Sequence, residues 1–228
     1  MSEKMSEKTK HRNTEIRSLI IGAKLVSTLF RPMYYPVLGW IALFSLTTPL
    51  SLFPYQYKLI HLAILILFTI ILPMTLTLIY RHVRHLDPLE MRKRTSRIIP
   101  YIMFIACYVL YLYLMRSYYI DYKLLAVIIV ALLIQVVCTF MSFFWKVSVH
   151  AAGSGAIIGG IAAFSFGYVF NHLLWLSGAI LLAGLVGTSR MILRQHNLSQ
   201  IVVGYIVGAL CGFAGILFGS IFLFGNPF

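Results

Sequence analysis

The sequence LLAVIIVALLIQVVCTFMSFF, residues 124–144, contains no charged side chain. About twenty apolar residues in a helix cross the hydrocarbon core of a membrane, so this stretch predicts a transmembrane helix. Composition extends the prediction to the whole chain, because 60% of the 228 residues are apolar and only 11% are charged. Soluble domains carry about 25% charged residues, and a water-soluble fold would lack polar side chains to cover it. The sequence therefore predicts an all-α, polytopic bundle of transmembrane helices.

Further apolar stretches lie on both sides of this one, separated by short polar segments. The predicted spans are 34–53, 58–80, 98–116, 124–144, 151–170, 173–188 and 200–223. The first contains two prolines and the sixth is short, so six or seven spans fit the sequence. Residues 1–32 are predicted to form a basic N-terminal arm with an amphipathic, interfacial helix, ahead of a transmembrane domain over residues 33–228.

The chain is strongly basic, with 19 Lys and Arg against 6 Asp and Glu and a net charge of +13. Nucleic-acid-binding domains are also basic, but they lack apolar runs of this length, so no nucleic-acid partner is expected. Seven spans leave only Lys58, Arg116 and Lys123 on one side, and every other Lys and Arg on the opposite side. The positive-inside rule makes the cation-rich side cytoplasmic. We therefore expect an integral protein of a bacterial inner membrane, with cations that suit membrane lipids and phosphorylated ligands.

Small residues recur at every fourth position in two spans. They are Gly204, Gly208 and Gly212 in the last span, and Ala152, Ala156 and Gly160 in the fifth. This spacing predicts that helix backbones approach closely, with the lining of a substrate path as the alternative. Such contacts occur within one chain or between chains, which leaves the oligomeric state open.

Polar and ionisable residues gather where three predicted spans begin on the basic side. They are Arg92, Lys93 and Arg97 before the third span, Lys146, Ser148 and His150 before the fifth, and Ser189, Arg190, His196 and Gln200 before the last. Ionisable groups at membrane depth are usually functional, and helix N-termini favour anions. Together these groups predict a phosphate-binding site. Two histidines beside it can provide a nucleophile and a general acid.

The spacing of these residues resembles the motifs of the type 2 phosphatidic acid phosphatase (PAP2) family of membrane phosphatases. The third family motif, Ser-Arg-x5-His-x3-Asp, is matched by Ser189, Arg190 and His196. Gln200 stands where the family has its Asp. A neutral amide can still accept a hydrogen bond from the imidazole and fix its tautomer, but it cannot stabilise an imidazolium as a carboxylate does.

The other two motifs match in part. The second, Pro-Ser-Gly-His, is matched by Ser148 and His150, with valines in place of its Pro and Gly. In the first, Lys-x6-Arg-Pro, Pro100 is present, Arg92 takes the Lys position and Ile99 takes the Arg position. Two other cations could act in place of the missing arginine, Lys93 and Arg97.

The resemblance implies a role for each residue. His196 is expected to be the nucleophile that forms a phospho-histidine, His150 the acid that protonates the leaving oxygen, and Arg190 the clamp on the phosphoryl oxygens. The other expected phosphate ligands are Ser148, Ser189, Lys146, Arg92, Lys93 and Arg97. Replacing the Asp of a Ser-His-Asp triad by Asn lowers turnover about 10⁴-fold. We therefore hypothesise that Asp87 or Glu90 supplies the charge that Gln200 lacks.

The leading hypothesis is the metal-independent hydrolysis of a lipid phosphate or diphosphate, without a cofactor. Phosphatidic acid, phosphatidylglycerol phosphate and a polyprenyl diphosphate are the candidate substrates. No metal site is expected, since His150 and His196 have no carboxylate or thiolate ligands near them in sequence. The alternative is a catalytically weak or inactive PAP2-like protein that binds or transports a lipid phosphate. A purely structural subunit is disfavoured, because buried Arg190 and His196 would then be costly without a function.

Overall fold

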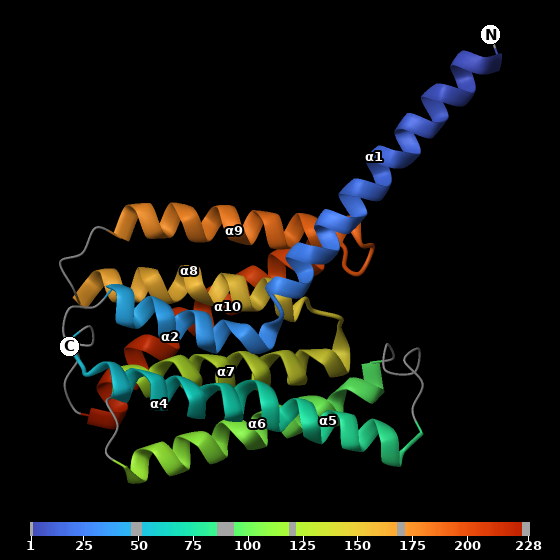
Figure 1. Cartoon of the computed structure of the whole chain (residues 1–228). Helices are drawn as coiled ribbons and strands as arrows, with labels where there is room; N and C mark the ends of the chain where they lie inside the picture. Colours follow the sequence, from blue (N-terminus) through green and yellow to red (C-terminus); the bar gives the residue numbers. More distant parts are fainter. Residues whose placement is uncertain (1, 47–51, 86–93, 119–121, 168–171, 225–228) are drawn as a thin grey trace.

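The computed structural model describes residues 2–46, 52–85, 94–118, 122–167 and 172–224. Every regular element in these ranges is a helix, which confirms the all-α class. The α-helices are α1 (Ser2–Leu29), α2 (Tyr35–Leu46), α4 (Tyr55–Ile66), α5 (Leu72–Val83), α6 (Arg94–Ser117), α7 (Tyr122–Phe144), α8 (Val149–Gly167), α9 (His172–Ile192) and α10 (Leu198–Phe224) (Figure 1). A 3-10 turn, Pro32–Tyr34, precedes α2, and a π-helical turn, Leu67–Ile71, joins α4 to α5.

Five helical bodies in the described ranges are long and apolar enough to cross a membrane. They are Tyr55–Val83, Ile98–Ser117, Leu124–Phe144, Leu173–Ile192 and Leu198–Phe218. Two shorter apolar helices, Pro32–Phe44 and Val149–Ser165, coincide with the first and fifth predicted spans. This architecture is compatible with an integral, multi-pass membrane protein.

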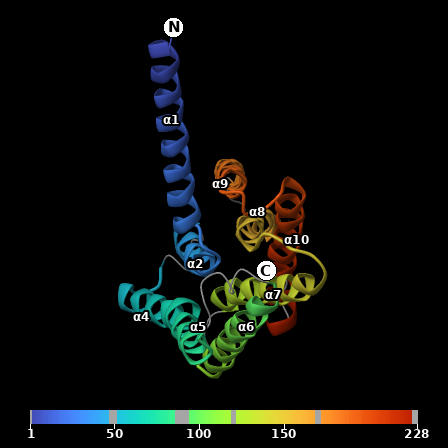
Figure 2. The same ribbon diagram turned by 90° about the vertical axis from the view of Figure 1, so that its right-hand side faces the viewer.

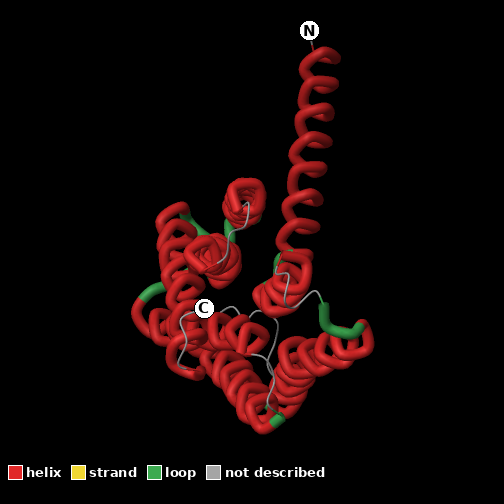
Figure 3. Tube along the Cα trace, turned by 90° about the vertical axis from the view of Figure 1, so that its left-hand side faces the viewer, coloured by secondary structure: helices red, strands yellow, loops and turns green. Residues whose placement is uncertain are grey.

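The helices other than α1 lie side by side, and their ends gather at two opposite ends of the bundle (Figure 1). At one end α5, α7 and α9 finish, while α6, α8 and α10 begin. We call this the site end. Seen along the bundle, α8, α9 and α10 form one group and α4, α5 and α6 another, with α7 between them (Figures 2 and 3). Helix α1 projects away from the site end and contacts α9.

The glycine stripe of α10 packs directly on α8, so the close approach of backbones that its spacing predicted occurs within the chain. A Cβ atom built on Gly208 would collide with the carbonyl oxygen of Ala152, and one on Gly212 with that of Ala156. The backbones of the two helices are therefore in contact, which only glycine at these positions allows. This contact fixes the first turns of α8 and α10 next to each other at the site end.

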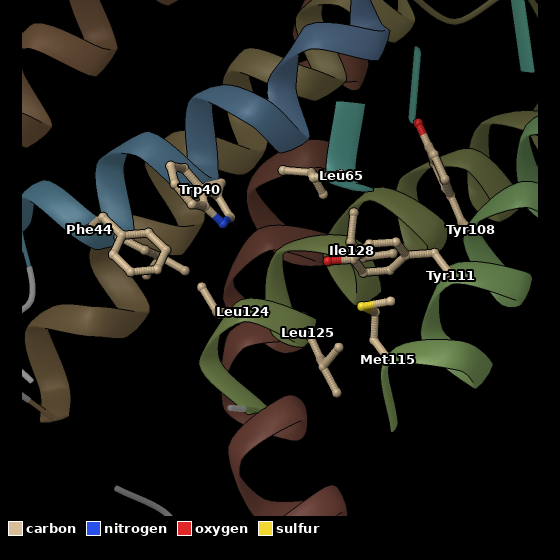
Figure 4. Packing of buried hydrophobic residues seen from close by; sticks show 10 residues of the cluster. Trp40, Phe44, Leu65, Tyr108, Tyr111, Met115, Leu124, Leu125 and Ile128 are labelled. Atoms are coloured by element: carbon tan, nitrogen blue, oxygen red, sulfur yellow. The ribbon is translucent and has the colours of Figure 1, made fainter. Parts of the chain in front are cut away.

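A cluster of buried apolar side chains joins α2, α4, α6 and α7. Its members are Trp40, Leu43, Phe44, Leu65, Tyr108, Tyr111, Met115, Leu124, Leu125 and Ile128 (Figure 4). Aromatic rings supply much of the contact, with the tilted rings of Trp40 and Phe44 4.3 Å apart between centroids. Burial of large aromatic surfaces stabilises helix packing. The cluster holds α2 and α6 against α7, and α6 and α7 also contribute to the wall of the site described next.

Candidate active site

A cavity of about 610 Å³ opens at the site end of the bundle. Helices α1, α6, α7, α8 and α9 and the turn after α9 all contribute to its wall. The polar side of this wall consists of Lys24, Ser27, Thr28, Arg31, Gln135, His150, Arg190, Gln195 and His196. We refer to it as the cationic cavity. Three of the sequence-predicted residues therefore meet here, His150, Arg190 and His196.

The turn between α9 and α10 brings Arg190 and His196 into the same wall. The N–H of Gln195 donates to the carbonyl oxygen of Arg190 at 3.1 Å, and the N–H of Arg194 donates to that of Met191 at 2.9 Å. This pattern is a Schellman motif, and Arg194 takes its left-handed position with φ of 51°. Glycine is the usual residue there, so the sequence does not signal this reversal.

His196 is oriented by the first turn of α10. Its Nδ1 lies 3.0 Å from Oε1 of Gln200, and the N–H of Asn197 donates to the same oxygen at 3.4 Å. Asn197 is the N-cap and Gln200 the third helical residue, so the side chain of Gln200 forms half of a capping box. A backbone N–H needs an acceptor, which identifies the amide atom as oxygen. Nδ1 of His196 therefore carries the proton, and the neutral ring keeps its lone pair on Nε2.

His150 is held by the first turn of α8. The hydroxyl oxygen of Ser148 accepts a bond from the N–H of Ala151 at 3.4 Å, as an N-cap serine does. The N–H of Ser148 donates to the carbonyl oxygen of Gln200 at 3.3 Å. This backbone bond ties the first turn of α8 to the first turn of α10. The two histidines consequently line one cavity.

Helix α1 closes the cavity from the outside. Nη1 of Arg190 donates to the hydroxyl oxygen of Ser27 at 2.6 Å. His150 lines the same cavity as Ser27. Ser27 is buried, although most of the helix around it is exposed. Ser27 thus holds the predicted phosphate clamp in the wall that also contains the predicted general acid.

The cavity is built to receive an anion. Lys24, Arg31 and Arg190 line it, and no Asp or Glu side chain stands in the described wall. The first turn of α8 also faces the cavity, with Val149 and His150 in the wall, and the positive end of a helix dipole favours negative charge. Lys146 supports the wall from behind, because its Nζ donates to the carbonyl oxygen of Gln195 at 2.7 Å.

Gln135 of α7 adds a neutral donor to the wall. It is only 7% exposed, and its Nε2 atom has no hydrogen-bond partner in the described structure. Buried polar groups are nearly always paired, and an unpaired one costs about 1–3 kcal/mol. This amide is therefore available to a ligand that enters the cavity.

The remaining predicted site residues do not line the cavity in the described part of the chain. Ser148 is fully buried as the cap of α8, and the hydroxyl of Ser189 donates to the carbonyl oxygen of Val186 at 2.7 Å within α9. Lys146 and Gln200 act behind the wall. Four predicted residues, Arg92, Lys93, Asp87 and Glu90, lie outside the described residues, and so does the side chain of Arg97.

The contribution of α1 was missed by the sequence interpretation, which assigned residues 1–32 to an interfacial arm. The signal was nevertheless present. Lys24, Ser27, Thr28 and Arg31 are spaced by three or four residues, which places them on one helix face. A polar face within an otherwise apolar segment indicates a buried polar partner.

Neither protein-family profiles, curated proteins nor solved structures match this chain. Within the described residues, no group of three or more His, Cys, Asp or Glu side chains is arranged to hold a metal ion.

Proposed function

We propose that the protein is a membrane phosphatase that hydrolyses a lipid phosphate or diphosphate, with a PAP2-like bundle of six or seven spans. One observation carries the proposal. His150, Arg190 and His196 come from separate elements and line one cavity with Lys24 and Arg31. Two imidazoles among three cations, at the end of an apolar bundle, suit a phosphate ester whose remainder is a lipid.

In the proposed reaction Nε2 of His196 attacks the phosphorus atom. The bond from phosphorus to the lipid oxygen breaks, and His150, which takes up a proton when the anionic substrate binds, donates that proton to the lipid oxygen. His150 then accepts a proton from water, which attacks phospho-His196 and releases inorganic phosphate. The cations neutralise the charge on the phosphoryl oxygens through both steps, so no metal is required.

Gln200 is the feature that limits this chemistry. It fixes the proton on Nδ1 of His196, but it does not offset the positive charge that the ring gains when Nε2 attacks. The same observation favours a second candidate function. A cavity with three cations and a neutral partner for His196 also suits a protein that binds or transports a lipid phosphate without cleaving it.

The location of the site completes the proposal. Lys24 of α1, Arg31 and Arg190 of α9 all lie in the wall of the cavity at the site end. The positive-inside rule then orients the cationic cavity toward the cytoplasm, in the inner membrane of a bacterium. Its substrate would be drawn from the cytoplasmic leaflet.

The test is phosphate release by the purified full chain in detergent, with a chelator present. Phosphatidic acid, phosphatidylglycerol phosphate and a polyprenyl diphosphate are the substrates. We expect release by the wild type and a loss of at least about 10³-fold in His196→Ala, because the nucleophile is gone. His82→Ala, an exposed histidine of α5, is the matched control and should retain wild-type activity.

Gln200→Glu separates the two candidate functions. Glutamate has the length of glutamine and keeps the capping box, so it places a carboxylate beside Nδ1 of His196. We expect turnover to rise, by up to about 10⁴-fold if the charge acts as it does in serine proteases. Binding of phosphatidic acid without phosphate release in both wild type and Gln200→Glu would reject the phosphatase and favour the carrier.

A further inference from the structure

An apolar groove adjoins the cationic cavity. It lies between α2, α7 and α8, and its wall includes Gly39, Ala42, Val130, Ala131, Gly160 and Phe164. Its volume is about 120 Å³, against about 610 Å³ for the cationic cavity. A space this narrow between helices suits one hydrocarbon chain rather than two.

The walls of the groove and the cavity are continuous. Three segments contribute residues to both spaces. The cavity is lined by Met33, Gln135 and His150, and the groove by their near neighbours in sequence, Tyr35, Ile134 and Gly153. The ring of Tyr35 packs against Gly153, where no Cβ atom would fit beside it. Its hydroxyl donates to the carbonyl oxygen of His150 at 3.1 Å. Tyr35 therefore stands at the boundary where the polar wall becomes apolar.

The groove has the depth of one membrane leaflet. Along α8 its wall runs from Gly153 to Phe164, a rise of about 16 Å at 1.5 Å per residue. The hydrocarbon core of a bilayer is about 30 Å thick, so one leaflet measures about half of that. A chain that enters at the site end would thus reach roughly the midplane.

Gln135 identifies the chemistry at the entrance. Its unpaired Nε2 donor lies in the wall of the cationic cavity, and the next residue toward the groove is Ile134. A donor at this position fits an acceptor between the phosphate and the hydrocarbon chain. The carbonyl oxygen of a fatty acyl ester is such an acceptor, whereas an isoprenoid chain has none.

We propose that the groove binds one acyl chain of a phosphoglycerolipid whose phosphate occupies the cationic cavity. The ester carbonyl accepts a hydrogen bond from Gln135, and the chain lies beside Tyr35 along α2, α7 and α8. This assignment rests on the proposed function for the chemistry at the phosphate, and binding alone is enough to test it.

The test fills the groove. A Cβ atom on Gly160 would meet only Ile216, at 3.9 Å, so a side chain can begin at this position in the groove wall, and Gly160→Leu is designed to occupy the groove. Gly178→Leu on α9 is the matched control, because nothing lies within 4 Å of its Cβ position. Both are made in the His196→Ala background, and binding of dipalmitoyl and dihexanoyl phosphatidic acid is measured by native mass spectrometry. Short chains need little of the groove.

We expect Gly160→Leu to lower the ratio of dipalmitoyl to dihexanoyl affinity at least tenfold, and Gly178→Leu to preserve it. Ala42→Leu fills the groove from α2 and should act in the same way if Gly160→Leu does not fold. An unchanged ratio in a folded groove variant would overturn the proposal. So would a selective loss of farnesyl diphosphate binding, which would assign the groove to an isoprenoid. If the proposed phosphatase function is wrong, the wild type will bind the lipid without releasing phosphate, and this outcome is distinct from a change in the affinity ratio.

Discussion

The two sides of α8 carry similar small residues, but one side packs closely on a neighbouring helix and the other side borders open space. Toward α10, Gly155 and Gly159 leave no room for a Cβ atom, because the backbone of the facing helix occupies that space. On the side of α2 and α7, Gly153 admits the ring of Tyr35, and Gly160 faces the open groove. One side of the helix is a fixed contact, and the other borders both cavities.

The difference arises in the partner helices. Small residues of α10 stand opposite the small residues of α8, so the two backbones touch. Helices α2 and α7 instead border α8 across the groove, with large side chains such as Tyr35 and Val130 beside small ones such as Gly39 and Ala131. Where small residues let the two backbones touch, no space remains between the helices. On the other side of α8, the mixture of large and small side chains leaves the apolar groove.

The largest effect is expected from breaking the fixed contact. Gly208→Leu would place a side chain against the carbonyl oxygen of Ala152, where the backbone of α8 cannot yield. Overpacking typically costs about 1–3 kcal/mol, and a backbone contact should lie at or above the top of that range. We expect little folded protein on size-exclusion chromatography in detergent. Wild-type behaviour of Gly208→Leu would mean that α8 and α10 do not touch.

A smaller effect is expected from the polar contacts that hold α1 over the cavity. Ser27→Ala removes the acceptor for Nη1 of Arg190. A hydrogen bond to a charged group contributes about 1.5–3 kcal/mol, so the affinity for phosphatidic acid should fall about tenfold or more. In turnover measurements, we expect the loss of affinity to appear as a rise in KM with a smaller change in kcat, because Ser27 positions Arg190 and does not react.

Two variants on the same helix make this result interpretable. Ser27→Thr keeps the hydroxyl and should restore binding. Ser18→Ala removes a serine whose hydroxyl bonds only to the local carbonyl oxygen of Glu15, and it should bind like the wild type. Equal losses in Ser27→Ala and Ser18→Ala would indicate a general effect on α1 rather than a link to Arg190.

Much of the fold could be predicted because it depends on local chemistry. Long apolar runs predict membrane helices whatever their partners are, and the glycine stripe of α10 predicted a close approach of helix backbones, for which the structure supplies α8 as the partner. Of the expected span 34–53, the structure describes α2 as far as Leu46, and residues 47–51 lie outside the described residues. The groove was not predicted, because it depends on which helix faces which.

The candidate site was predicted in part for the same reason. His150, Arg190 and His196 follow motif spacing and meet in one cavity. The cations of α1 reach that cavity through tertiary contact, which no motif marks. Ser148 matched a motif, yet its hydroxyl caps α8, a role that serine takes at many helix starts. Its predicted role at the phosphate stays a prediction.

The smallest effect is expected on the open side of α8, where a methyl group should be tolerated. Gly160→Ala has only Ile216 near its new Cβ, at 3.9 Å, and alanine favours a helix over glycine by about 0.8–1 kcal/mol. We expect a thermal unfolding temperature equal to or slightly above that of the wild type. Gly204→Ala on the facing helix α10 is the matched change at the packed contact, where the Cβ would lie 2.7 Å from the carbonyl oxygen of Ser148, and it should lower that temperature. If both variants were destabilised equally, α8 would be packed alike on its two sides, and the groove would have no room for a chain.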